Sequence, residues 1–329
     1  MRLNPEMKLL NPLDSGLKKA ATREGFGAAL AEIADKDQNV VALSSDVAGS
    51  VQMGPFMKKY PGRFFNVGVA EQNLAAVAAG LAYAGKIPFI GAFAAFSPGR
   101  NWEQIRTTIC YGEANVKIEG SHTGLDVGED GATHQMLEDI ALMRSLPNML
   151  VLSPCDYLEA IKATHAAWKS PGPAYIRCTR GKLPIFTTAE TPFEVGKINL
   201  LAEGEDIAIV ATGNMVHPSL VAASILEKEG LSVAVANMHT LSHPDAEMLE
   251  KLARKCGSIV TVEDHQIKGG LGSAVCETLS EIYAVRVKRH GVQMKFGESG
   301  AGSEVLKKHG LDANGIAEVV RKEIFFRKR

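Results

Sequence analysis

The fold is decided by residues 64–80, which read FFNVGVAEQNLAAVAAG. A short apolar run ends at Val69, and the acid Glu71 then precedes a series of Ala, Val, Leu and Gly residues. Acidic side chains are favoured in the first turn of a helix because they face the positive end of its dipole. Beyond Asn73 the segment has no polar face, which predicts a buried helix that begins at Glu71.

Two roles are open for Glu71. It can simply cap the N-terminus of the helix, or it can hold or exchange a proton in a dry site. A carboxylate at the edge of a buried segment is costly unless it is paired. The spacing alone does not choose between the structural and the functional role.

Short apolar segments alternate with helical segments on both sides of this stretch. In the first half of the chain we expect strands at residues 40–43, 64–67, 87–93, 116–118, 149–152 and 174–176, with helices that include 21–35 and 101–111. Apolar strands that alternate with helices favour a mostly parallel sheet covered on both faces. We assign residues 19–186 to this α/β domain.

A second, smaller α/β domain is expected over residues 206–329. Its strands are predicted at residues 207–210, 233–235, 259–262 and 285–287, with a charged helix near 317–326. Residues 187–205 are rich in Pro, Thr, Glu and Gly and are interpreted as a linker, and residues 1–18 as an irregular N-terminal arm. A chain of 329 residues is long enough for two such domains.

Composition excludes several classes of function. The net charge is -1, so nothing suggests a nucleic-acid or membrane surface. The longest apolar stretch, residues 74–85, is too short to span a bilayer. The five cysteines are scattered and form no C-x-x-C, which fits reduced thiols and gives no zinc spacing. We therefore expect a cytoplasmic protein.

Polar clusters follow the predicted strands, where ligands bind on parallel sheets. The longest is residues 121–135, SHTGLDVGEDGATHQ, which contains two histidines and three acids. Long loops in compact domains are usually functional, and His titrates near neutrality. The histidines are far apart and no thiolate is near, so a polar sugar or proton-transfer site is favoured over a metal site.

Two further patterns each have a structural and a functional interpretation. Phe93 and Phe96 stand on either side of two alanines. The two rings can be core residues, or they can form an aromatic platform for a planar ring. Arginine suits bidentate phosphate contacts, although any single one is more often a surface charge. Several arginine side chains directed into one cleft would indicate a phosphorylated substrate. The candidates are Arg23, Arg100, Arg177 and Arg180.

The ordered motifs make the chain resemble transketolase from about residue 20 to residue 324. They are AEQN, FAAF, RNWEQIR, SHTG, GEDGATHQ, IRCTR, TVEDH with GGLG, and FGESG. The resemblance covers only the pyrimidine-binding and C-terminal domains. No counterpart is found of the N-terminal domain that holds the diphosphate and Mg²⁺, and no metal ligand is assigned here. The resemblance implies the C-terminal subunit of a split transketolase, with two α/β domains.

The resemblance also implies roles for single residues toward thiamine diphosphate. Glu71 matches the acid that hydrogen-bonds N1′ of the aminopyrimidine and so promotes loss of the thiazolium C2 proton. Phe96 matches the ring stacked on the aminopyrimidine, and Phe93 lines the same pocket. Asp46 falls near the thiazolium. Arg100 aligns only after one inserted residue and receives no role.

Other matching positions face the sugar substrate in the family. The resemblance implies that His122 and His134 assist proton transfer on sugar hydroxyls. Asp130 matches a further position that contacts the substrate. The groups implied to hold the sugar phosphate are Arg23, Ser50 and Arg180. The activity implied is that of EC 2.2.1.1, transfer of a two-carbon ketol unit from a ketose phosphate to an aldose phosphate in the pentose phosphate pathway.

The family further implies an assembly. Its cofactor lies between the pyrimidine domain of one chain and the diphosphate domain of another. The resemblance therefore implies a homodimer of this chain through the helix that begins at Glu71. Two N-terminal subunits, which carry the Mg²⁺, would complete an α2β2 heterotetramer.

Three alternatives stay open. The β subunit of a 2-oxo acid dehydrogenase has a similar length and the same acid, but its usual loop lacks the histidine motifs. A 1-deoxyxylulose-5-phosphate synthase shares the acid and the THQ segment but typically lacks FAAF. A non-catalytic interaction relative would tolerate loss of Glu71, His122 or His134, and all three are present.

Overall fold

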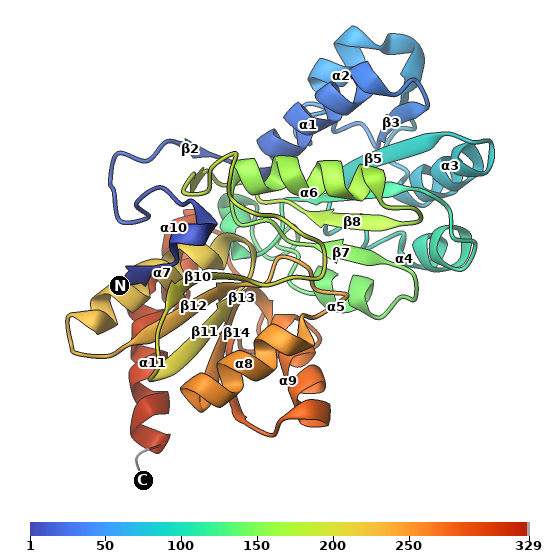
Figure 1. The fold of residues 1–329 in the computed structure, drawn as a ribbon. Helices are drawn as coiled ribbons and strands as arrows, with labels where there is room; N and C mark the ends of the chain where they lie inside the picture. Colours follow the sequence, from blue (N-terminus) through green and yellow to red (C-terminus); the bar gives the residue numbers. More distant parts are fainter. Residues whose placement is uncertain (328–329) are drawn as a thin grey trace.

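A computed structural model describes residues 1–327, and these form two α/β domains (Figure 1). The predicted fold class is confirmed. The first strand and the last described helix both belong to the second domain in space, because the strand joins its sheet and the helix packs on it (Figure 1). None of the described helices has the length and apolar character needed to cross a membrane.

The first domain is built on a sheet of six parallel strands. They are β3 (Val40–Ser44), β4 (Phe64–Asn66), β5 (Ile87–Phe93), β6 (Lys117–Ser121), β7 (Leu150–Leu152) and β8 (Ala174–Arg177), in the order β4-β3-β5-β6-β8-β7. The strand residues alternate between two apolar cores, as expected of a sheet covered on both faces. Parallel pairing places all the carboxyl ends of the strands at one edge.

Helices cover both faces of this sheet. One face is covered by α1 (Thr22–Lys36), α2 (Gly54–Lys59) and α6 (Tyr157–Lys169). The other face is covered by α3 (Glu71–Tyr83), α4 (Trp102–Gln104), the π-helical segment η3 (Ile105–Cys110) and α5 (Asp139–Arg144).

The second domain has a mixed six-stranded sheet in the order β1-β10-β12-β11-β13-β14. Its strands are β1 (Arg2–Leu3), β10 (Asn199–Glu203), β11 (Ile207–Ala211), β12 (Val233–Asn237), β13 (Ser258–Gln266) and β14 (Arg286–Val292). The last four are parallel, whereas β1 and β10 run antiparallel to their neighbours. Its helices are α7 (Val216–Glu227), α8 (Ala246–Cys256), α9 (Leu271–Ile282), α10 (Gly302–Lys308) and α11 (Ala313–Arg327).

The stretch predicted as a linker, residues 187–205, contains a strand. β10 adds to the edge of the second sheet, so the domain begins before residue 206. The strand was missed because only Leu200, Leu201 and Ala202 are apolar, between polar and charged neighbours. The arm of residues 1–18 is held by the same edge, since β1 pairs with β10.

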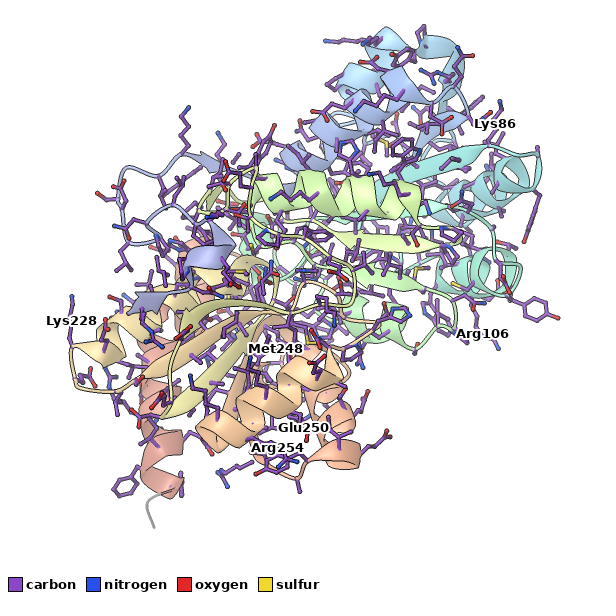
Figure 2. The ribbon with its side chains drawn as sticks, viewed as in Figure 1. Lys86, Arg106, Lys228, Met248, Glu250 and Arg254 are labelled. Carbon is purple, nitrogen blue, oxygen red and sulfur yellow. The ribbon has the colours of Figure 1, made fainter. Side chains whose placement is uncertain are left out.

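The helix α3 differs from the prediction that it is buried all round. Leu74, Ala75 and Ala78 are buried against the sheet, whereas Ala76 and Gly80 on its other side are exposed. Figure 2 labels Lys86 and Arg106, which lie near this outer edge of the first domain. Among residues 1–327 no element covers that side, so part of the apolar surface of α3 is exposed.

A buried arginine of the first domain reaches the second domain. Arg177 donates from Nε to Oδ2 of Asp139 at 2.8 Å and from Nη2 to the carbonyl of Asp264 at 2.8 Å. The Tyr175 hydroxyl donates to the same Asp139 oxygen at 2.9 Å. Arg177 therefore makes a structural contact between the two domains and is not free to bind a phosphate. The sequence pattern did not predict this contact.

Candidate active site

The predicted site residues gather at the carboxyl edge of the first sheet. The acid Glu71 follows β4, the two phenylalanines end and follow β5, and His122 follows β6 directly. Ligands bind at this edge in open parallel sheets because loops from several strands converge there.

Glu71 begins α3 and is only 2% exposed. Its Oε2 accepts a hydrogen bond of 2.7 Å from Nη1 of Arg100, and its carbonyl accepts one of 3.0 Å from Asn101. The Arg100 guanidinium also lies 4.9 Å over the centre of the Phe96 ring. The buried acid is thus paired, as a buried carboxylate must be to be tolerated.

Arg100, which received no role from the resemblance, contacts both Glu71 and the Phe96 ring. The position of Arg100 after β5 indicated the ligand-binding edge of the sheet. The inserted residue in the preceding loop made it unclear which position of the related family Arg100 corresponds to. The Arg100 side chain is 50% exposed, whereas that of Glu71 is 3% exposed.

Four rings form a cluster beside Glu71. Phe93 lies 4.0 Å from His122 between ring centres and 6.4 Å from Phe96, with the last pair stacked. His134 stands edge-on to Phe96 at 5.4 Å. Both phenylalanines are half-buried, and Phe93 also packs against one of the apolar cores of the first domain. The structure therefore brings residues of two segments, 93–96 and the 121–135 loop, into one aromatic cluster.

His122 has an uncommon backbone conformation, with φ of 57°. A non-glycine residue there costs about 1–3 kcal/mol and marks a position fixed by its surroundings. Its Nδ1 lies 3.0 Å from the Ser121 hydroxyl, and its Nε2 lies 3.4 Å from Nη1 of Arg23. Burial, assisted by Arg23, Arg180 and His134, lowers the pKa of His122 to about 3. The imidazole is therefore neutral at neutral pH.

Two arginines line the side of the site near His122. Nη1 of Arg23 donates to the carbonyl of Ser50 at 2.7 Å, so Ser50 holds it through its backbone. No carboxylate of residues 1–327 lies within ion-pair distance of Arg23. Arg180 contacts the 121–135 loop, with 2.9 Å to Glu129 and 3.9 Å to Asp130. The net positive charge here is provided mainly by Arg23.

Asp46 stands apart from the aromatic cluster. It has φ of 66°, and its side chain accepts from Nδ2 of Asn66 at 2.8 Å. Within the described chain its hydrogen bonds go to Asn66 and not to the four rings. It shares the carboxyl edge of the sheet with them. No group of three or more His, Cys, Asp or Glu among residues 1–327 is arranged to hold a metal.

Comparison with protein families gives two matches that together span most of the chain. Residues 18–185 match the family described as transketolase, pyrimidine binding domain, and residues 196–316 match transketolase, C-terminal domain. A protein of Methanocaldococcus jannaschii named as a transketolase C-terminal section is 44% identical over 94% of this chain and 98% of its own length.

Other relatives also align over nearly their whole length. The 6-deoxy-6-sulfo-D-fructose transketolase subunit of Clostridium sp. strain MSTE9 is 38% identical over 93% of this chain and 95% of the relative. Among solved structures, a split gene transketolase described as an inactive beta4 tetramer superposes with a TM-score of 0.85. It is 42% identical and covers 94% of this chain and 99% of that one.

Proposed function

Because this chain belongs to the transketolase family, we propose that it is the C-terminal subunit of a split transketolase. With an N-terminal subunit that supplies the diphosphate domain and Mg²⁺, it would transfer a two-carbon ketol unit from a ketose phosphate to an aldose phosphate. The observation that carries the proposal is the buried Glu71 carboxyl at the start of α3, next to the Phe96 ring.

The residues present fit the aminopyrimidine end of thiamine diphosphate. The cofactor, when bound, supplies the carbanion chemistry of ketol transfer. Glu71 would hold a proton at the aminopyrimidine nitrogen, and the half-buried Phe93 and Phe96 rings would flank the heterocycle. Asp46 is proposed to approach the other ring. Arg100 would release Glu71 on cofactor binding and remain over Phe96.

The substrate is proposed to carry an anionic end group. Within residues 1–327 Arg23 has no carboxylate partner, and Ser50 and Arg180 lie on the same side of His122. Two relatives act, by their names, on a sulfonated sugar and on apulose 4-phosphate, which are both anionic. His122, His134 and Asp130 are proposed to contact the sugar hydroxyls, where a neutral imidazole accepts or returns a proton.

Replacing Arg23 by Gln should weaken binding of a ketose phosphate specifically. A hydrogen bond from a charged group contributes about 1.5–3 kcal/mol, so KM should rise about 10- to 100-fold. The measurement is KM of the two-subunit complex for a ketose phosphate and for the same ketose without phosphate. The unphosphorylated substrate is the internal control, and an equal loss for both would contradict a phosphate role for Arg23.

A second copy of this chain is proposed to cover the exposed face of α3. A side chain at Gly80 would meet no atom within 4 Å in the single chain, so Gly80→Arg should fold but dissociate the dimer. Gly54→Arg is the matched control, since that glycine is equally open on a different helix. Sedimentation velocity of both variants is the measurement. A Gly80→Arg chain that remained dimeric would place the interface elsewhere.

A further inference from the structure

Glu119 is a buried acid to which neither the fold nor the proposed reaction gives a role. It lies in the middle of β6 and its side chain is fully buried. Neither of its carboxyl oxygens has a hydrogen-bond partner among the described residues. Burial raises the pKa of Glu119 well above its usual range, although Arg23 and Ser121 oppose this shift. Buried acids without partners are rare, so its neighbours are informative.

The space for this acid is provided by the adjacent strand. Gly91 on β5 is the register partner of Glu119 on β6. A Cβ atom at Gly91 would lie 2.9 Å from Oε2 of Glu119 and 2.8 Å from Cε of Met53. The carboxyl group therefore lies in a tight space between the two strands. Because side chains alternate along a strand, Glu119 and Ser121 are on the same face of β6.

The hydrogen-bond partners of His122 fix its tautomer. A guanidinium group only donates, so the 3.4 Å contact from Arg23 favours an accepting His122 Nε2. A neutral imidazole has one donor and one acceptor, so Nδ1 carries the proton and donates to the Ser121 oxygen. The Ser121 hydroxyl, which accepts from Nδ1, must direct its own hydrogen to a different acceptor.

We propose that Glu119, whose oxygens have no partner in the geometry described, turns to accept this hydrogen and acts as a positioning residue, which together with Arg23 holds the Nδ1–H tautomer of His122 through the Ser121 hydroxyl. A carboxyl group offers an accepting oxygen whether or not it is protonated. The Nε2 lone pair of His122 then points toward Arg23 and the site. Its use in sugar proton transfer rests on the proposed function, whereas the tautomer itself does not.

The test is nitrogen NMR of the full chain labelled with ¹⁵N-histidine, with the His122 signals assigned by their loss in His122→Gln. We expect a protonated Nδ1 and an unprotonated Nε2 in the unsubstituted chain. Glu119→Gln keeps an accepting oxygen and should keep this pattern. Glu119→Leu has similar bulk without an acceptor, so the Ser121 hydroxyl turns to Nδ1. The proton then moves to Nε2, the 3.4 Å contact from Arg23 is given up, and the protonated-Nδ1 signal should be lost.

A protonated Nε2 in the unsubstituted chain, or an unchanged tautomer in a folded Glu119→Leu chain, would overturn the proposal. If Glu119→Leu fails to fold, the pair Ser121→Ala and Ser121→Thr replaces it. Only the threonine keeps the hydroxyl, so only Ser121→Ala should lose the protonated-Nδ1 signal; its retention there would equally overturn the proposal.

Activity provides a separate readout. In the two-subunit complex, Glu119→Leu should lower kcat by about 10², the lower end for loss of a proton-transfer group, while Glu119→Gln keeps it. Because the NMR signal is read without cofactor or partner, failure of the proposed ketol transfer leaves the tautomer result standing. Equal kcat losses in Glu119→Gln and Glu119→Leu would contradict the positioning of His122 by Glu119 through Ser121.

Discussion

Glu71→Ala lowers the rate of ketol transfer by about 10² or more, while the chain keeps its fold. The acid is proposed to be the group that holds a proton at the aminopyrimidine, and no second carboxylate of residues 1–327 shares its contact with Arg100. Folding should survive because the Arg100 side chain left behind is half exposed and can be solvated. The measurement is kcat of the two-subunit complex at saturating thiamine diphosphate, with thermal unfolding of the chain alongside.

Glu103→Ala is the matched control for this result. Glu103 is an exposed acid in α4, close in sequence to Arg100 but outside the aromatic cluster. Its loss should leave kcat unchanged. Near-normal turnover by Glu71→Ala, or an equal loss in both variants, would remove Glu71 from the reaction.

Asp139→Ala destabilises the chain by about 3–5 kcal/mol, the usual cost of removing one member of a buried ion pair. Asp139 is fully buried, and its carboxylate accepts from both Arg177 and Tyr175. Without it the Arg177 guanidinium is left buried without its carboxylate partner, since that side chain is only 3% exposed. Urea unfolding of the Asp139→Ala chain and of the unsubstituted chain measures the difference in free energy of unfolding.

The comparison variant is Glu229→Ala, which removes an exposed partner of Arg321. Exposed ion pairs contribute little because water and salt screen them. The midpoint of urea unfolding should therefore move much more for Asp139→Ala than for Glu229→Ala. Similar shifts would show that the buried Arg177–Asp139 pair does not stabilise the chain as argued.

Much of the fold could be predicted because local pattern and global structure agree. The acid at the start of α3 and the apolar strands on both sides of it fixed the first domain. The strand β10 was missed because a short apolar core between polar residues gives little signal at the edge of a sheet. The exposed face of α3 was missed because an apolar helix surface is the same in sequence whether its own chain or another chain covers it.

The candidate site was predictable only in part. The aromatic and histidine residues, brought together in the structure, were recognisable from residue type and position after strands. The pairing of Glu71 with Arg100, and of Arg177 with Asp139, depends on side-chain directions that spacing does not encode. Glu119 gave no signal because a single acid in an apolar strand resembles a surface position until burial is known.

The most direct test of the central claim is reconstitution from two purified subunits. This chain would be assayed for transfer of a two-carbon unit from a ketose phosphate to an aldose phosphate, with thiamine diphosphate and Mg²⁺, alone and after addition of the N-terminal subunit. The account predicts no turnover by this chain alone and turnover by the mixture. Full turnover by the isolated chain, or a mixture that reacts only with a 2-oxo acid, would contradict it.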